Sequence, residues 1–197
     1  MDKKELIKIK KLKGDVRGCC IKEIIELLKR KKLEREIQKI EEKIRSYNFY
    51  LDLKKIDLLE MYPLSEKIIL LYSIFEILNL KKQDIKMIGE EAAKLSFANK
   101  TLTKFFTSLK VLFDKAPEIW RWYFDFGKIL PIELDENEKY LLFRIENFNV
   151  PRLYCIFLNG FFETVIGYVI KEEKIKIEEL KCTAEGDKFH EFKIYWS

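Results

Sequence analysis

The spacing of the apolar residues changes once along this chain, after Gly127 and Pro131. Before that point apolar side chains recur at helical spacing, and residues 21–47 predict one long amphipathic helix. After it come alternating strand patterns and one apolar run, in the order 139–146, 153–170, 174–181 and 190–196. This order predicts an α+β fold in which a helical N-terminal part packs on a small antiparallel sheet.

A chain of 197 residues suits one domain with a real core, so we expect a single domain over residues 1–197. Within it, residues 1–20 form a basic lead-in, residues 21–127 are mainly helical, and residues 139–197 form a β-α-β-β module. Capping and turn residues predict further helices near 65–78, 84–97 and 101–113, with a short one opening at Ala116-Pro117.

The net charge of +5 is mild, and the basic runs are interleaved with Ile, Leu and Glu. Such runs are typical of solvated helix faces, and there is no Arg-rich stripe with alternating aromatics, so we expect no nucleic-acid partner. The N-terminus has no apolar signal region, and the vicinal pair Cys19-Cys20 suits a structural disulfide poorly. These features predict a reduced, cytoplasmic location.

The run from Leu153 to Ile170 is barely long enough to cross a membrane. It contains Asn159, Gly160 and Glu163, and no second run of this kind accompanies it. A buried helix at the centre of the domain is therefore the better prediction, with no membrane span.

Four side chains of metal-ligand type gather near the C-terminus, in the pattern Glu179-x2-Cys182-x7-His190 with Cys155 upstream. Thiolate, imidazole and carboxylate are the groups that Zn²⁺ prefers, usually four at a time. The pattern predicts a structural Zn²⁺ site, closed because protein groups fill all four positions. The alternative is a buried core histidine bonded to a carbonyl, with Cys182 as a small apolar side chain.

Glu179 is the least secure of these ligands, because Glu178, Glu185 or Asp187 could replace it. In an ideal strand, residues three apart face opposite sides. Glu179 and Cys182 can therefore converge only if the strand bends or bulges near Leu180-Lys181.

Residues 139–196 resemble the 4-vinyl reductase domain family, which includes bacteriochlorophyll-pathway proteins, archaeal stand-alone proteins and the sensory domains of phenol-responsive activators. The motifs are Tyr154-Cys155-x4-Gly160-Phe161-Phe162 and Glu179-x2-Cys182-Thr183-Ala184-x-Gly186-Asp187-x2-His190-x-Phe192. Residues 16–127 agree with the family in layout only. The resemblance implies a pocket for small apolar molecules beside a structural zinc held by Cys155, Glu179, Cys182 and His190. The last of these stands where the sensory relatives have Cys. The fold is also similar to subunits of the TRAPP transport particle.

Aromatic residues are candidates for the wall of such a pocket, although plain core packing is the better explanation for any single one of them. The residues favoured for the pocket are Phe105, Trp120, Tyr123 and Phe161. Trp120 and Trp122 lie two positions apart on a helix, so they cannot both line one cavity closely.

These observations predict a cytoplasmic binding module for a small apolar molecule, acting as a sensor or carrier with a structural zinc. Because we expect no output domain, its signal would pass through a homodimer or a partner protein. The alternative is a scaffold or assembly protein of TRAPP-like fold without a ligand. An enzyme acting on a tetrapyrrole or hydrocarbon ranks last, since neither G-x-G-x-x-G nor a P-loop is present.

Overall fold

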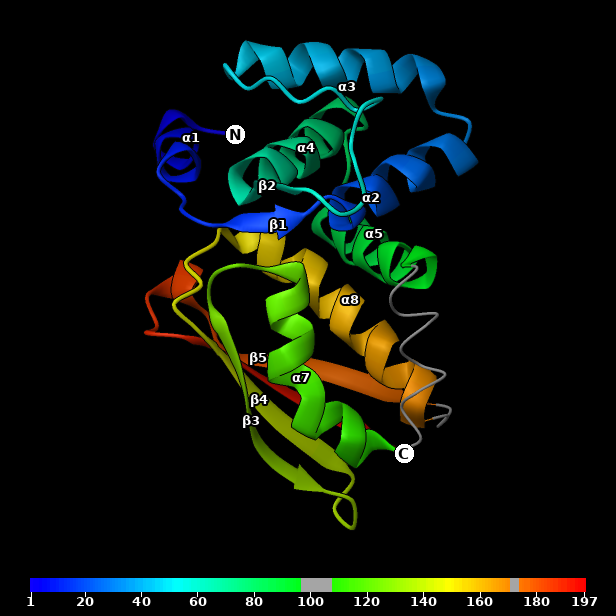
Figure 1. Ribbon diagram of the computed structural model, residues 1–197, viewed down its shortest axis with the longest axis vertical. Helices are drawn as coiled ribbons and strands as arrows, with labels where there is room; N and C mark the ends of the chain where they lie inside the picture. Colours follow the sequence, from blue (N-terminus) through cyan, green and yellow to red (C-terminus); the bar gives the residue numbers. More distant parts are fainter. Residues whose placement is uncertain (97–107, 171–173) are drawn as a thin grey trace.

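The computed structural model describes residues 1–96, 108–170 and 174–197. It confirms the predicted α+β class, because a helical part packs on one end of a module built around a small antiparallel sheet (Figure 1). Buried residues of the two parts belong to one continuous core.

The helical part consists of helices that surround a buried central one, α4. Its helices are α1 (Lys3–Lys10), α2 (Cys19–Arg30), α3 (Glu34–Ser46), α4 (Leu64–Ile77) and α5 (Lys82–Leu95). A two-stranded sheet joins β1 (Asp15–Arg17) to β2 (Met61–Pro63). The residues of α4 from Ile68 to Ile74 are buried on every side, as expected for a helix that is apolar all round.

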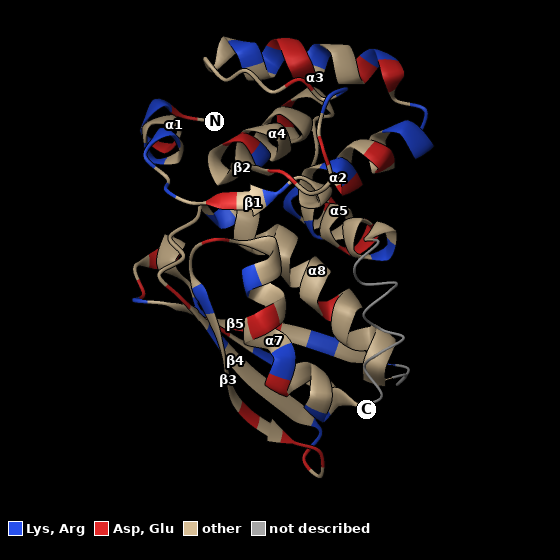
Figure 2. Cartoon of the chain, in the orientation of Figure 1, with Lys and Arg blue, Asp and Glu red and all other residues tan. Residues whose placement is uncertain are grey.

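The prediction of one helix over residues 21–47 is wrong, because the chain breaks between α2 and α3. Lys32 adopts a positive φ of 56°, and the amide of Leu33 donates to the carbonyl of Leu28 at 3.1 Å. This turn ends α2 and lets α3 fold back over α4. Burying the apolar stripe of α3 on α4 outweighs the continuous helical pattern. Figure 2 shows that residues of both signs of charge alternate along α3.

The larger sheet has the strand order β3-β4-β6-β5, and every neighbouring pair is antiparallel. Its strands are β3 (Lys128–Asp135), β4 (Tyr140–Glu146), β5 (Ile175–Lys181) and β6 (His190–Trp196). Strand β3 was not predicted. Pro131 obscures its pattern, since a proline is unusual in a strand, and the register shifts between Pro131 and Glu133. The edge position of β3 tolerates both features.

Two helices pack against this sheet: α7 (Leu109–Tyr123) contacts β3, and α8 (Arg152–Ile170) contacts β5. The predicted helix at 101–113 begins outside the described residues. The predicted helix start at Ala116-Pro117 is wrong, because α7 runs unbroken through Pro117. Leu109, Leu112 and Trp120 share the buried side of α7, so packing holds the helix together despite the missing proline N–H.

By length and composition α8 could cross a membrane. In the folded chain it packs against α5, and its first half, including Tyr154, Cys155 and Phe157, is buried. This agrees with the prediction of a buried helix for residues 153–170. The cytoplasmic location stays a prediction.

Helices α5 and α8 approach each other backbone against backbone. A Cβ atom on Gly89 of α5 would lie 2.0 Å from the carbonyl oxygen of Phe157, and one on Gly160 of α8 would lie 2.0 Å from that of Lys86. Real Cβ atoms do not come so close to a carbonyl, so only glycine allows this spacing. The two glycines thereby set the position of α8.

We expect Gly89→Ala and Gly160→Ala each to lower the free energy of unfolding by about 2 kcal/mol or more, because the helices must separate. Gly167→Ala in the same helix is the control, since its Cβ would meet only the flexible end of Ile175 at 3.3 Å. Urea denaturation followed by circular dichroism measures all three. Equal stability of the three variants would contradict the proposed role of the close approach.

Candidate functional site

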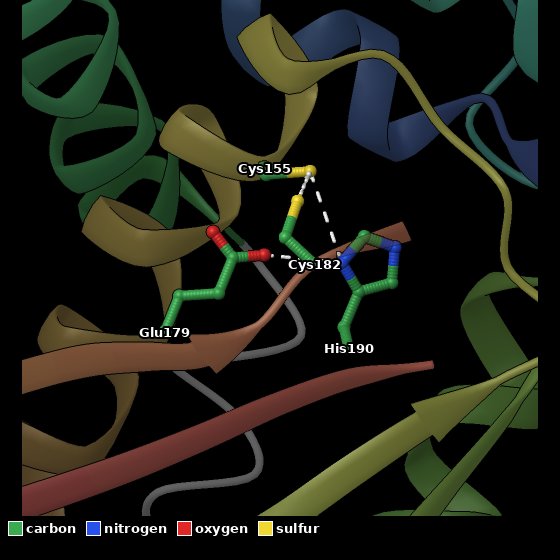
Figure 3. A group of neighbouring side chains, drawn as sticks. All are labelled: Cys155, Glu179, Cys182 and His190. Carbon is green, nitrogen blue, oxygen red and sulfur yellow. Dashed lines mark hydrogen bonds and ion pairs between the residues drawn. The ribbon is translucent and has the colours of Figure 1, made fainter. Parts of the chain in front are cut away.

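Four side chains from α8, two strands and one turn converge beside the first turns of α8 (Figure 3). Cys155 comes from α8, Glu179 from β5, Cys182 from the turn after β5, and His190 from the start of β6. One potential ligand atom from each residue lies within 4.8 Å of all the others. The structure thus brings together all four residues predicted as metal ligands.

The strand irregularity that this convergence requires is present. The register of β5 against β6 shifts between Glu179 and Lys181, and Leu180 is turned outward and half exposed. Because of this bulge, Glu179 and Cys182 reach the same side of the sheet. The prediction of a bulge near Leu180-Lys181 is confirmed.

The four groups are tightly packed and almost fully shielded from solvent. The sulfur atoms of Cys155 and Cys182 lie 3.6 Å apart, and the Cys155 sulfur lies 3.9 Å from Nδ1 of His190. The same Nδ1 lies 3.0 Å from Oε1 of Glu179. Both cysteines are free thiols. Groups of these types at this separation can ligate a metal ion or share protons among themselves.

Neighbouring groups orient the cluster. Nε2 of His190 lies 2.7 Å from the carbonyl oxygen of Phe148, which can only accept, so the Nε2–H donates there and Nδ1 faces the cluster. The hydroxyl of Thr183 also lies 2.7 Å from Nε2. Arg152 forms an ion pair with Glu179 and a second one with Glu185 at 3.2 Å.

Charge is distributed unevenly across the cluster. Burial raises the pKa of the Glu179 carboxyl, but hydrogen bonding to His190 and the charge of Arg152 outweigh burial and hold it below its ordinary value. Hydrogen bonding with Cys155 lowers the pKa of the Cys182 thiol to about 6, while the pKa of Cys155 is raised. The cluster therefore favours a carboxylate at Glu179 and a thiolate at Cys182.

A separate apolar cavity of about 120 Å³ lies between α7, α8 and the sheet. Apart from Cys20 and Lys67, its lining is hydrophobic and mostly aromatic or branched. Trp120, Tyr123 and Phe161, three of the residues favoured for a pocket, are among the lining residues. Phe105 lies outside the described residues. That these side chains contact a ligand stays a prediction.

The cavity has a polar end where α2 and α4 meet α8. Lys67, on the first turn of α4, is the charged residue among the described lining, and it is 3% exposed. Glu23 on α2 is 7% exposed and interacts electrostatically with Lys67. Burial raises the pKa of Glu23 to about 7, although Lys67 and Ser96 oppose this shift.

No family model matches the chain, and no curated protein matches it. Solved structures do. The chain is similar to an H-NOX protein from S. oneidensis in the Fe(II)NO ligation state, with a TM-score of 0.70 and 16% identity over 92% of this chain and 99% of that chain. It is also similar to an Fe(II) unliganded H-NOX protein from K. algicida, with a TM-score of 0.64 and 14% identity over 92% of this chain and 96% of that chain.

A third similar structure is an oxygen-binding H-NOX domain related to soluble guanylate cyclases, with a TM-score of 0.59 and 16% identity over 91% of this chain and 92% of that chain. At these identities the likeness shows the fold alone. The protein therefore has the fold of H-NOX domains, over nearly its whole length.

This finding overturns the resemblance to the 4-vinyl reductase domain family and to TRAPP subunits. That resemblance rested on short motifs in residues 139–196, whereas the structural likeness spans 92% of the chain and leads to H-NOX domains. The motifs misled because they cover few positions, and Gly160 and His190 have local reasons in this chain: Gly160 allows the close approach to α5, and His190 donates to the Phe148 carbonyl.

The prediction of Zn²⁺ as the cofactor is corrected by the same comparison. The similar solved structures are described by Fe(II) or by heme redox potential and porphyrin distortion, and their descriptions give no support to zinc. Converging Cys, Glu and His side chains are not by themselves evidence of zinc, because hydrogen bonds and the Arg152 ion pair already satisfy much of the cluster.

Sequence reasoning missed residues that shape the four-residue cluster and the apolar cavity. Arg152 and Thr183 hold the cluster, and Lys67 and Glu23 form the polar end of the cavity. Lys67 had a detectable signal, because it is followed on the same helix by seven residues, Ile68 to Ile74, that include no charge. Glu23 had none, since Glu26 on the same helix is the same residue type and lies at the surface.

Glu23 makes stability depend on pH. Its pKa in the folded chain, about 7, is above its ordinary value of 4.5, so the folded state holds a proton that the unfolded state releases. This contribution is full below pH 4.5 and is lost as pH rises through 7. Between pH 4.5 and 8, we expect the free energy of unfolding of wild type to fall by about 3 kcal/mol relative to that of Glu23→Gln.

Urea denaturation at several pH values measures this difference. Glu26→Gln is the matched control, because Glu26 lies on the same helix with its side chain 43% exposed. Its difference from wild type should stay constant with pH. A constant difference for Glu23→Gln as well would show that folding does not change the pKa of Glu23.

Proposed function

We propose that this protein is a binding module for a small apolar molecule, which it holds in the cavity between α7, α8 and the sheet. The observation that carries the proposal is the cavity itself, about 120 Å³ of space lined almost wholly by apolar side chains. Protein interiors are close-packed, and spaces of this size are few in any domain. A scaffold protein filled by its own side chains has no need of one. The H-NOX fold, whose solved examples hold NO and O₂, supports a role as a sensor.

The size of the cavity limits the ligand. An apolar protein cavity of about 150 Å³ stays dry and binds benzene. The cavity here, at about 120 Å³, suits a molecule of one ring or a short chain. Trp120, Phe143 and Phe161 supply ring surfaces against which such a ligand can pack.

The residues of this chain do not fit heme. Heme iron takes His, Cys thiolate, Met or Tyr as its protein ligand. Among these types, the described lining offers Cys20 and Tyr123. Burial raises the pKa of the Cys20 thiol, so this thiol keeps its proton and is not a thiolate ligand. The hydroxyl of Tyr123 lies 3.3 Å from that of Ser96. The sequence has one histidine, His190, and both of its ring nitrogens already have partners away from the cavity.

The undescribed segment 97–107 does not change this conclusion, because its sequence contains no His, Cys, Met or Tyr. One cation, Lys67, would also have to serve both propionates of a porphyrin. We therefore infer that the ligand enters the cavity directly rather than through a heme.

Ligand-observed NMR with toluene tests the proposal. We expect saturable binding by wild type, and loss of at least about tenfold in affinity for Ala116→Trp, which fills the cavity from α7. Val111→Trp is the control, because Val111 lies on the same helix and is 38% exposed. Circular dichroism verifies that each variant is folded. Absence of toluene binding to wild type, or equal binding by Ala116→Trp, would reject the cavity as the site.

The metal-ligand role of Cys155, Glu179, Cys182 and His190 belongs to this proposal, with the ion to be identified by measurement. Its support is the separation of the four ligand atoms, all within 4.8 Å of one another. We expect native and denatured masses to differ by one metal ion, and elemental analysis to identify it. Cys182→Ser should lose the ion and unfold at a lower temperature. Cys19→Ser, a buried cysteine outside the cluster, is the control. Equal native and denatured masses would leave the cluster as a hydrogen-bonded network.

A further inference from the structure

Lys67 is an unusual residue for the place it occupies. It lies on the first turn of α4 and is 3% exposed, whereas lysine is almost never buried without a partner charge. Within the described part of the chain it forms no ion pair. Its ammonium lies instead over the rings of Tyr154 and Phe157, 5.3 and 4.8 Å from their centroids. Cation–π contacts offset only part of the cost of burying a charge.

The surroundings keep Lys67 charged. Burial lowers the pKa of Lys67, but hydrogen bonding to Tyr154 and the charges that its neighbours, including Glu23, can carry raise it, and the pKa lies above its ordinary value. Glu23 balances this charge incompletely, since burial makes it a weak acid near neutral pH. The site therefore keeps a positive charge that lacks a full counter-charge.

This charge adjoins the apolar cavity. Lys67, Cys20 and Phe157 all belong to the lining, so the ammonium stands at one end of a space whose other walls are hydrophobic. Beside it, the hydroxyl of Tyr154 is buried. Its oxygen interacts with the Lys67 ammonium, which can only donate, so the hydroxyl proton has no acceptor among the described residues. Burial raises the pKa of Tyr154 to about 12, so this hydroxyl keeps its proton and can donate it. The Lys67 ammonium, which lacks a full counter-charge, and the Tyr154 hydroxyl, whose proton lacks an acceptor, thus lie side by side.

We propose that the ligand of this cavity carries a single carboxylate, which Lys67 binds at the polar end while the apolar body fills the remaining space. This inference rests on the proposed function and names the ligand class: a one-ring or short-chain carboxylic acid. The carboxylate gives Lys67 a counter-ion in a nonpolar setting, where such a pair is stronger than in water. It also brings an acceptor close to the Tyr154 hydroxyl.

Glu23 competes with the ligand for Lys67. When the carboxylate of Glu23 is charged, it repels a second carboxylate at the same ammonium. Removing the charge of Glu23 should therefore change the affinity for a carboxylate ligand in the direction opposite to removing the charge of Lys67. Glu23→Gln should tighten binding of a carboxylate ligand, and Lys67→Met should weaken it.

Isothermal titration with benzoate, toluene and benzylamine at pH 7 tests this proposal. These three probes share one ring and differ in bearing an anion, no charge or a cation. We expect wild type to bind benzoate more tightly than toluene and to exclude benzylamine. Lys67→Met should weaken benzoate binding about tenfold or more and leave toluene binding nearly unchanged. Tyr154→Phe, which keeps the ring, should weaken benzoate binding to a smaller degree.

The outcomes separate this inference from the proposed function. Toluene bound in preference to benzoate, with Lys67→Met leaving benzoate affinity unchanged, would overturn the carboxylate inference and keep the apolar cavity. Binding of no probe would reject the proposed function itself. If Lys67→Met does not fold, the other two variants test the inference. Benzoate affinity should rise in Glu23→Gln and fall in Tyr154→Phe. A benzoate affinity equal to that of wild type in both variants would overturn the inference.

Discussion

The contact between α5 and α8 is the constraint on which the other features of this protein depend. Gly89 and Gly160 let the two backbones touch, and this fixes where α8 lies over the sheet. The first turns of α8 then deliver Cys155 to the side-chain cluster, and the following turns deliver Phe157 and Phe161 to the cavity. One helix position therefore determines both candidate sites, because a helix moves as a rigid unit.

The two sites differ in how their charges are satisfied. In the cluster, the buried carboxylate of Glu179 meets Arg152 and His190, so its charge is compensated within the fold. At the cavity, Lys67 meets aromatic faces and the weak acid Glu23. A compensated charge stabilises a structure, whereas an incompletely compensated one is a place where a ligand can add free energy. This contrast makes the cavity the better candidate for binding.

The metal-ligand set shows how far sequence reasoning reached. Spacing alone placed Glu179, Cys182 and His190 on one hairpin, and a bulge was expected where β5 loses register. The convergence followed from strand geometry and was predictable. The likeness to H-NOX domains was not, because at 14% to 16% identity it lies in the course of the whole chain and not in short motifs. Nor could the partners of His190 be foreseen, since the Phe148 carbonyl reaches it from a loop 42 residues away in sequence.

By itself the sequence determined the α+β class, the strands β4, β5 and β6, and the buried helix α8, because apolar spacing is a local property of the chain. Only the tertiary structure decided that α2 and α3 separate, that α7 continues through Pro117, and that β3 completes the sheet. In each case burial against a distant segment outweighed a local preference. The isolation of Lys67 was decided in the same way, since the groups around a side chain come from parts of the chain that meet only on folding.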